Sequence, residues 1–455
     1  MTRITNYVGK SAVDNVTKAI AKARDNEKFH ALLALTEDRA LKRAKLVDEG
    51  KITGRLAGVP FVVKDNFLAF GAPTTAASQI LENFDAPLQA TAVEALEAEG
   101  AICIGKANLD AFAHGSSTEN SAFGPTKNAH DMTKVAGGSS GGSAVVTALD
   151  IVPFALGTDT GGSIRQPASF NGVVGLKPSY GAVSRYGVVA MASSTDCIGC
   201  FTTNSEDAEL ILSIMSGLDQ KDMTTLPDYY EPELLQEKLT VGVVKELMTD
   251  DVDSDVRERV NDYITRIKAA GHEVREISIP IVTHTLAMYY IIVPAEVSSN
   301  LARYDGVRYG RRAEAKNLAE LYGKSREEGF MLENKRRIMI GSYVLSSGFF
   351  DAYYQQAQKA RTLLIKEFKN AFNKCDLLLS PTVPSPAFGF GENTDDPIKM
   401  YLSDAMTVSA NLTGIPALSI PAGISKSGLP IGVQLMAPYK FDARLLAFAK
   451  SMEDN

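Results

Sequence analysis

Two glycine- and serine-rich turns lie close together in this chain and constrain how it can fold. Residues 137–143 read GGSSGGS, and residues 157–167, which follow an apolar run, read GTDTGGSIRQP. Glycine lets the backbone turn sharply and lets a ligand approach the main chain closely. A serine hydroxyl becomes a nucleophile when a base takes its proton. Either turn alone could be purely structural, but the two together within residues 137–169 indicate a reaction site.

Short apolar segments alternate with helical patterns along most of the chain. We expect two amphipathic helices within residues 11–50, with Ser11 and Thr36 as N-caps, and a further helix capped by Ser254. Strands are expected at 58–63, 101–104, 151–156, 239–244, 273–279, 377–379, 418–421 and 433–435, and helices at 91–99, from Asn108, at 142–149 and over most of 285–375. This alternation predicts an α/β fold whose sheet is covered by helices on both faces.

Charge and cysteine content exclude several classes of protein. The 455 residues include 47 Lys and Arg against 54 Asp and Glu, so the net charge is −7. This argues against broad direct contact with nucleic acid, although a partner subunit could make such contact. The four cysteines are too few for a disulfide framework, and the spacing of Cys197 and Cys200 is interpreted as incidental because no second metal-binding pair follows.

The N-terminus and the hydropathy pattern bear on where the protein resides. Residues Met1–Lys10 contain no apolar core of a signal peptide, and no uninterrupted apolar run reaches the ~18 residues of a membrane span. We therefore expect a soluble, cytoplasmic protein with no membrane contact.

The serines in the two turns need a base, and the sequence offers two kinds. Residues 137–141 match the G-x-S-x-G nucleophile elbow, which requires a later acid and histidine. None of the five histidines, at positions 30, 114, 130, 272 and 284, lies in a stretch typical of a catalytic loop. A phosphate-binding loop also fails, because the turn lacks the required lysine. Lys64, at the end of the strand 58–63, is the other candidate, although a lone lysine there is usually a surface charge.

Considered together, these segments resemble the amidase signature family. The resemblance is carried by the GGSSGG turn, the GGSIRxP segment around Ser163, and the strand that ends in Lys64-Asp65-Asn66. It implies a mixed central β-sheet covered by helices on both faces. It also implies a single domain over 1–455. The middle segment 218–285, which begins with a polar connection, is expected as a peripheral lobe.

The family resemblance assigns roles to the three side chains. It implies Ser163 as the nucleophile, Ser139 as a bridge that passes the proton, and Lys64 as the final base, with a cis peptide bond before Ser139. A neutral lysine can accept the proton that Ser139 relays. The backbone N–H groups of Thr160, Gly161 and Gly162 are expected to form an oxyanion hole, while Asp159 and Arg165 are expected to hold the loop.

Within that family, the chain is most similar to the glutamine-hydrolysing subunits of tRNA-dependent amidotransferases. The distinguishing stretches are 115–125, 298–306, 335–338 and 346–354. The resemblance implies that Arg337 binds the α-carboxylate of glutamine, that Asp404 binds its α-ammonium group, and that Tyr289 contacts the same ligand.

The resemblance also implies partners. Ammonia from glutamine would serve the conversion of Glu-tRNA(Gln) to Gln-tRNA(Gln) on a partner subunit of a heterotrimer. That complex has two other subunits, and the tRNA is contacted mainly through the partner. No cofactor or metal is expected in this chain, and ATP and Mg are expected on the partner. The alternative is a free-standing amidase that acts on small or aryl amides. A non-catalytic scaffold is disfavoured because Lys64, Ser139 and Ser163 are all present.

Several positions depart from the pattern usual for these subunits. The family's methionine is replaced by His114, its Pro-Trp pair by Ala129 and His130, and two further positions by Cys197 and Cys200. The triad and the substrate positions are intact, so the departures leave the reaction type unchanged. The family pattern therefore does not define the fine shape of the pocket mouth or the exact route of ammonia in this chain.

Overall fold

The computed structural model describes residues 2–227, 229–235, 238–393 and 397–453. Within them, eleven strands form one sheet in the order β1-β3-β2-β4-β6-β5-β10-β11-β9-β7-β8. Neighbours pair in parallel among β3, β2 and β4 and among β9, β7 and β8, and antiparallel elsewhere, so the sheet is mixed, as predicted. The strands are β1 (Leu32–Leu35), β2 (Pro60–Lys64), β3 (Ile102–Ala107), β4 (Phe154–Asp159), β5 (Val174–Lys177), β6 (Cys197–Thr202), β7 (Thr240–Val244), β8 (Glu273–Ile277), β9 (Leu377–Pro381), β10 (Ala417–Ile424) and β11 (Pro430–Met436).

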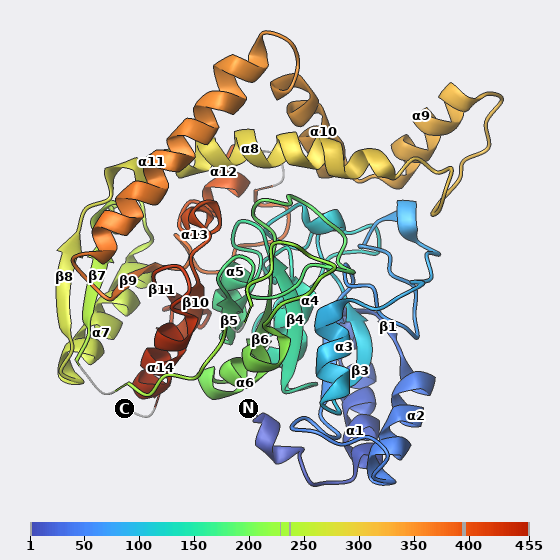
Figure 1. Ribbon diagram of the computed structural model, residues 1–455, viewed down its shortest axis with the longest axis horizontal. Coiled ribbons are helices and arrows are strands. Elements are labelled where there is room, and N and C mark those ends of the chain that lie inside the picture. Colours follow the sequence, from blue (N-terminus) through green and yellow to red (C-terminus); the bar gives the residue numbers. More distant parts are fainter. Residues whose placement is uncertain (1, 228, 236–237, 394–396, 454–455) are drawn as a thin grey trace.

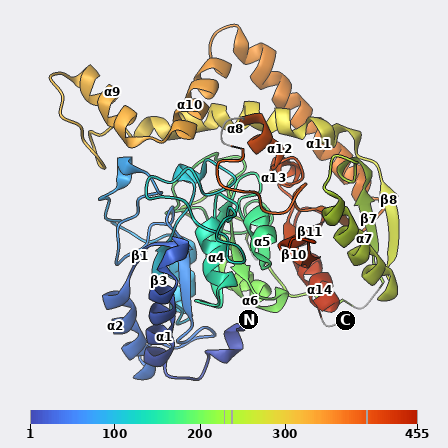
Figure 2. The same cartoon turned by 180° about the vertical axis from the view of Figure 1, so that it is seen from behind.

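Helices cover both faces of the sheet, as the sequence predicts. In Figure 1, α3, α6 and α14 lie in front of the strands, and the reverse view in Figure 2 brings α1, α4 and α5 forward. The helices are α1 (Ala12–Asp25), α2 (Glu37–Asp48), α3 (Thr91–Ala98), α4 (Gly141–Ala148), α5 (Arg165–Asn171), α6 (Ser205–Met215), α7 (Ser254–Ala269), α8 (Thr285–Asn300), α9 (Leu318–Gly329), α10 (Leu332–Val344), α11 (Gln355–Phe372), α12 (Pro397–Leu402), α13 (Val408–Thr413) and α14 (Asp442–Glu453).

Strand β2 shows why both faces need cover. All five of its residues are buried. Successive side chains of a strand point to opposite faces, so Phe61 and Val63 join one hydrophobic cluster and Val62 joins another that includes α1 and α4. A strand that is apolar on both sides is stable only between two helical layers.

Most helix starts agree with the prediction, and two differ in detail. Ser11 caps α1 through its side chain, as expected. Thr36 precedes α2, but its hydroxyl donates to a carbonyl of β3 at 2.8 Å instead of capping the helix. Helix α7 begins at Ser254, and its cap is the preceding Asp253, whose carboxylate accepts a backbone N–H. A carboxylate one position earlier satisfies the same exposed amides.

The prediction of a helix from Asn108 is wrong. That segment contains only a single 3-10 turn, Ala111–Ala113. The Asn108 side chain donates to two backbone carbonyls elsewhere, and the Asp110 carboxylate accepts the N–H groups of Thr118 and Asn120. These side-chain bonds replace the helical ones and hold the segment as an ordered loop.

The stretch 218–285 contains β7 and β8, which are the last two strands of the same sheet. The single domain with a peripheral lobe stays a prediction.

The predicted helical region over 285–375 is confirmed as α8 to α11. The stretch Pro280–Arg303 around α8 is long and apolar enough to span a membrane by length and composition, but half of it is buried inside the fold. Figure 1 shows α8 running across the top of the molecule, next to α10 and α11.

Candidate active site

The parallel pairing of β2 and β4 places Lys64 next to the second turn. The two strands are neighbours, with Val63 opposite Leu156, so both end at the same edge of the sheet. Lys64 is fully buried there, and its Nζ atom lies 2.8 Å from Thr158 Oγ1 and 2.8 Å from Ser139 Oγ. The structure therefore brings the predicted base into contact with the predicted proton bridge.

The environment of Lys64 favours the neutral amine. Burial lowers the pKa of Lys64 to about 7, and the carboxylates of Asp110, Asp159 and Asp196 oppose part of that shift. A neutral amine can donate its two N–H groups to the Thr158 hydroxyl and carbonyl, at 2.8 and 3.5 Å. Its lone pair then faces Ser139, so the amine can accept the proton of the Ser139 hydroxyl.

The first turn is held by contacts that require glycine. The peptide bond between Gly138 and Ser139 is cis, as the family resemblance implies. The Gly138 N–H donates to Gln166 Oε1 at 3.0 Å. A Cβ atom at Gly138 would lie 2.1 Å from the Asp110 carboxylate and 2.7 Å from the Ser117 nitrogen. No side chain fits between these groups, and the turn is therefore fixed against the loop that carries Asp110.

Ser163 lies beside the first turn with its hydroxyl uncommitted. Its carbonyl accepts the Ser140 N–H at 3.2 Å, which ties the two turns together. The residue is 8% exposed, and among the described residues its hydroxyl makes no hydrogen bond. Contacts between catalytic groups commonly tighten only when substrate binds. The geometry leaves this serine free to approach a ligand, while Ser139 is already bonded to Lys64.

The amides of the second turn differ in their availability. The Gly162 N–H donates to Asp159 Oδ1 at 2.9 Å and is therefore occupied. Within the described part of the chain, the N–H groups of Thr160 and Gly161 form no hydrogen bond. The oxyanion hole stays a prediction, and Thr160 and Gly161 supply its unoccupied donors.

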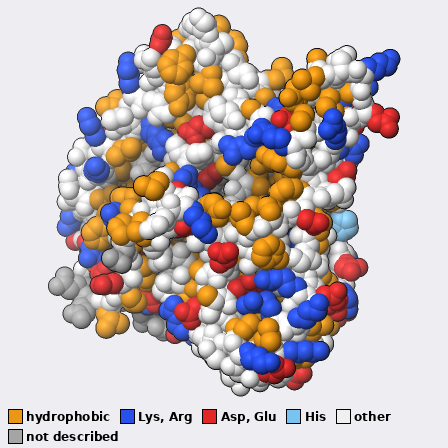
Figure 3. Space-filling view, turned by 45° about the vertical axis from the view of Figure 1, so that its right-hand side comes forward, with side chains coloured by type: hydrophobic (Ala, Val, Ile, Leu, Met, Phe, Trp, Pro, Cys, Tyr) orange, Lys and Arg blue, Asp and Glu red, His pale blue; other side chains and the backbone are white. Residues whose placement is uncertain are grey.

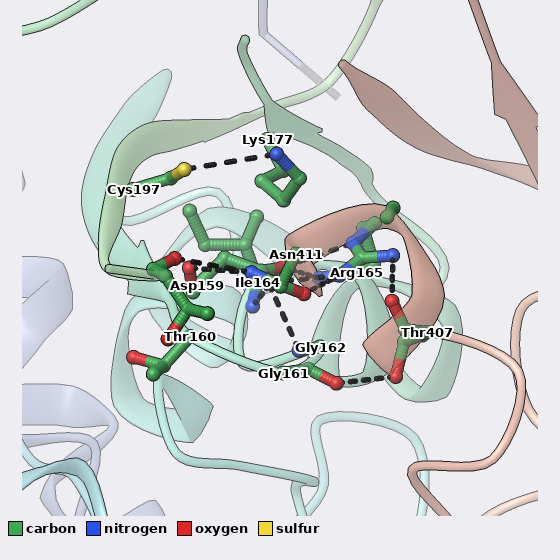
Figure 4. Close-up of polar contacts among 12 residues, drawn as sticks. Asp159, Thr160, Gly161, Gly162, Ile164, Arg165, Lys177, Cys197, Thr407 and Asn411 are labelled. Atoms are coloured by element: carbon green, nitrogen blue, oxygen red, sulfur yellow. Dashed lines mark hydrogen bonds and ion pairs between the residues drawn. The ribbon is translucent and has the colours of Figure 1, made fainter. Parts of the chain in front are cut away.

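Asp159 and Arg165 form the buried frame of this turn. Their side chains are both fully buried, with Arg165 Nη2 2.8 Å from Asp159 Oδ1. Arg165 also donates to Asn411 Oδ1 at 2.6 Å and to the Thr407 carbonyl at 2.9 Å, and Figure 4 shows these contacts converging beside Gly161 and Gly162. Burial by itself raises the pKa of Asp159, but the Arg165 guanidinium holds it well below its usual range. Asp159 also accepts the backbone N–H groups of Gly162 and Ile164, so this pair holds the loop.

The predicted substrate residues lie on two helices and a loop that meet above the turns. Helix α10 carries Arg337 and packs tightly on α8. The two helices are so close at Gly341 that a Cβ atom there would lie only 1.8 Å from the Pro294 carbonyl oxygen. Arg337 is buried, donates to Glu333 Oε1 at 2.7 Å, and lies over the ring of Tyr290, 4.6 Å from its centroid. Its Nη1 atom is buried without a partner in the described structure.

Tyr290 joins Arg337 to Asp404. The Tyr290 hydroxyl donates to Asp404 Oδ2 at 2.9 Å and accepts from Arg337 Nη2 at 3.4 Å. Asp404 Oδ1 accepts the Ser116 hydroxyl at 2.8 Å. Burial raises the pKa of Asp404 to about 6, and these two hydrogen bonds oppose the shift. The predicted cationic and anionic groups are thus held in one network.

Tyr289 precedes Tyr290 on the same helix and contacts the catalytic loop. A Cβ atom at Gly161 would lie 2.6 Å from the Tyr289 hydroxyl. The ring is buried, and its centroid is 5.1 Å from that of Tyr290. Tyr289 therefore reaches the predicted oxyanion loop, whereas Tyr290 reaches the charged pair.

A cavity of about 200 Å³ lies next to these residues. Its lining includes Ser116, Glu333, Arg337 and Tyr401 from the substrate end. The remaining lining residues are Asp110, His114, Gly115, Ser117, Glu119, Asn120, Leu332, Arg336, Asn393 and Met400. Asp110 and Ser117 also pack against Gly138, so the cavity adjoins the turn that carries Ser139.

Sequence reasoning missed three residues of this arrangement. Thr158, which binds the Lys64 amine, stands in the second turn but has no distinctive motif of its own. Tyr290 is adjacent to Tyr289 in the sequence, and only the geometry of the helix shows that Tyr290 is the one that contacts Asp404. Ser116 lies in the polar loop 115–125, where the sequence offers many hydroxyl groups.

Cys197 and Cys200 do not form a joint site. Both lie on β6 and are buried with free thiols. Residues three apart on a strand point to opposite faces, and Lys177 Nζ donates to Cys197 Sγ at 3.7 Å. Burial raises the pKa of both thiols. Their chemistry is that of small interior side chains.

Comparison with known proteins places this geometry in a family. The family model described as Amidase matches residues 14–446. The chain is 50% identical over 455 residues to the Glutamyl-tRNA(Gln) amidotransferase A subunit of Gloeobacter violaceus, covering 98% of this chain and 93% of that protein. It is also 50% identical to the protein of the same name from Carboxydothermus hydrogenoformans, covering 94% and 90%. The crystal structure of the Glutamyl-tRNA(Gln) amidotransferase A subunit from Thermotoga maritima superposes with a TM-score of 0.83 at 36% identity, covering 100% of this chain and 94% of that one.

Proposed function

The chain belongs to the amidase family, and from this premise we propose that it is the glutamine-hydrolysing subunit of a tRNA-dependent amidotransferase. In this proposal it supplies the ammonia that converts Glu-tRNA(Gln) to Gln-tRNA(Gln) on a partner subunit. The observation that carries the assignment is the network in which Tyr290 joins Arg337 to Asp404 beside the catalytic turns. A buried cation and a buried carboxylate held together suit an amino acid zwitterion.

In the proposed reaction, the three triad residues act in turn, and the contact between Lys64 and Ser139 supports the last proton transfer. The Ser163 oxygen attacks the side-chain amide carbon of glutamine, and its proton passes to Ser139 while the Ser139 proton passes to Lys64. The free amides of Thr160 and Gly161 receive the developing oxyanion, and the amide nitrogen of the substrate takes a proton back and leaves as ammonia. Water then hydrolyses the Ser163 ester through the same groups and releases glutamate.

The partner subunits supply the rest of the proposed reaction. Two other subunits are expected in a heterotrimer, with ATP and Mg on the partner and tRNA contacted mainly through it. The net charge of −7 supports a tRNA contact made mainly through the partner. On the face shown in Figure 3, acidic and basic side chains are interspersed. No cofactor or metal is proposed for this chain. The location proposed for it is the cytoplasm, without membrane contact.

The second candidate is a free-standing amidase for small or aryl amides. It is favoured only by the shared triad chemistry. A neutral amide offers no charge to Arg337 or Asp404, whose burial requires charged or hydrogen-bonding partners. The network at the substrate end therefore supports glutamine over this alternative.

Purification with the partner subunits, followed by amide hydrolysis assays, distinguishes the two. We expect the chain to co-purify with partners and the complex to hydrolyse glutamine far faster than acetamide. Replacing Ser163 by Ala should abolish this activity. Replacing Arg337 by Ala should raise the KM for glutamine much more than that for acetamide. A chain without partners that hydrolyses both amides equally would establish the free-standing amidase.

A further inference from the structure

His114 follows the 3-10 turn that lies at the edge of the cavity, and it is fully buried. Its Nδ1 atom lies 2.6 Å from the carbonyl oxygen of Phe112. A carbonyl oxygen only accepts hydrogen bonds, so Nδ1 carries the proton. In the neutral ring, Nε2 is then a bare lone pair that can only accept.

Burial and a neighbouring charge keep the ring neutral. Burial is the main cause that lowers the pKa of His114 to about 3, and the Arg337 guanidinium contributes to that shift, while the carboxylate of Glu333 opposes it. Both of these charged groups belong to the substrate end of the cavity. At neutral pH, His114 therefore presents an uncharged acceptor beside the group that is expected to bind a carboxylate.

None of the groups that the structure describes uses that acceptor. Nε2 of His114 is buried and has no hydrogen-bond partner among the described residues, and the residue lines the cavity together with Ser116 and Arg337. Arg337 Nη1 is likewise buried and unpartnered. Buried polar atoms in folded proteins are normally hydrogen-bonded. An unpartnered donor and an unpartnered acceptor on two residues that line one cavity suit a ligand that carries both an anionic group and an N–H donor.

The α-ammonium group of an amino acid meets this requirement. It carries three N–H donors, whereas both oxygens of Asp404 already accept a protein hydrogen bond, from Ser116 and Tyr290. Asp404 reaches the cavity only through Ser116, whereas His114 belongs to its lining and its Nε2 atom has no partner among the described residues, so it can complete the coordination. Ser116 connects the two acceptors, because it contacts Asp404 and lines the cavity with His114.

We propose that His114 Nε2 accepts a hydrogen bond from the α-ammonium group of the substrate and makes the site selective for amides that carry an α-amine. This proposal rests on the proposed function, because it assumes glutamine as the substrate. It adds a selectivity residue to the site, one that contacts the ligand and takes no part in the proton transfers of Ser163, Ser139 and Lys64.

The test compares glutamine with 4-carbamoylbutanoate, which is the same molecule without the α-amine. His114→Met replaces the imidazole by an apolar side chain of similar length whose sulfur is only a weak acceptor. In the complex with its partner subunits, we expect the variant to raise the KM for glutamine about tenfold with little change in kcat, as for one lost hydrogen bond to a charged group. Its kinetics with 4-carbamoylbutanoate should match those of the wild type. Equal losses with both amides, or no loss with glutamine, would overturn the proposal.

Two further measurements keep the result independent of folding and of turnover. His114→Asn retains an acceptor oxygen, so it should recover part of the preference for glutamine, and its failure to do so while folded would count against the hydrogen bond. Calorimetric titration of the Ser163→Ala complex should show weaker binding of glutamine when His114→Met is added, and equal Kd values would overturn the proposal. A wild-type complex that hydrolyses no glutamine would instead refute the proposed function.

Discussion

The amine of Lys64 lies 2.8 Å from Oγ of Ser139, although 75 positions separate the two residues in the chain. The contact arises because β2 and β4 are parallel neighbours and the helix that follows the first turn, α4, packs on the same strands. In the proposed mechanism, it gives the second serine, Ser163, a route for its proton that uses no histidine. The following predictions depend on this contact and on the network at the substrate end.

Replacing Lys64 by Met should lower kcat by about 10³-fold, because the final proton acceptor is lost. Steady-state glutamine hydrolysis by the complex measures this. Lys64→Arg is the matched control, since it keeps a cation that cannot lose its proton. It should be equally inactive. Recovery of activity by Arg would mean that Lys64 supplies a positive charge and not a base.

The rate should rise with pH through about 7. Below that value Lys64 is protonated and has no lone pair for the Ser139 proton, so kcat/KM should fall about tenfold per pH unit. Burial raises the pKa of Asp110 to about 7 and that of Asp404 to about 6. Asp404 ionises as the pH rises, and the ionised carboxylate binds the α-ammonium group of glutamine more strongly, so its titration also raises kcat/KM with pH. A pH profile of kcat/KM tests this. A maximum below pH about 6 would contradict the role of Lys64.

Replacing Tyr290 by Phe should raise the KM for glutamine about tenfold and change kcat little. The hydroxyl links Arg337 to Asp404, and a hydrogen bond to a charged group contributes ~1.5–3 kcal/mol. The ring itself remains and keeps its stacking on Arg337. Tyr401→Phe is the control, because its hydroxyl contacts Glu333 and not Asp404. A loss confined to kcat would place Tyr290 in the chemical step.

Replacing Gly341 by Ala should destabilise the protein by ~1–3 kcal/mol and raise the KM for glutamine. The new Cβ atom would lie 1.8 Å from the Pro294 carbonyl oxygen, so α10 would have to move away from α8 and take Arg337 with it. Thermal unfolding and kinetics measure the two effects.

Gly323→Ala in helix α9 is the matched control for that variant. A Cβ atom at Gly323 would have no neighbour within 4 Å. The substitution should therefore be neutral or stabilise the helix by up to ~1 kcal/mol. Equal stability changes at Gly341 and Gly323 would show that the helix contact does not set the position of Arg337.

Local patterns in the sequence predicted much of the fold. Strand β2 and helices α3 and α4 follow from apolar runs bounded by glycine, and the structure places them within one or two residues of the prediction. Strands β1, β5 and β6 were missed, and the helix expected from Asn108 is a loop. In each of these segments, pairing or side-chain bonds to distant parts of the chain outweigh local preference.

The sequence by itself determined the reacting groups. The two glycine-serine turns and the lysine after β2 are local motifs, and their resemblance to a family assigned their roles before any contact was known. Only the tertiary structure decided how these groups act. Sheet pairing brought Lys64 to Ser139, and burial lowered its pKa to about 7. The packing of α10 on α8 set Tyr290 between Arg337 and Asp404. Distance and solvent exclusion depend on contacts between remote segments, so no local pattern encodes them.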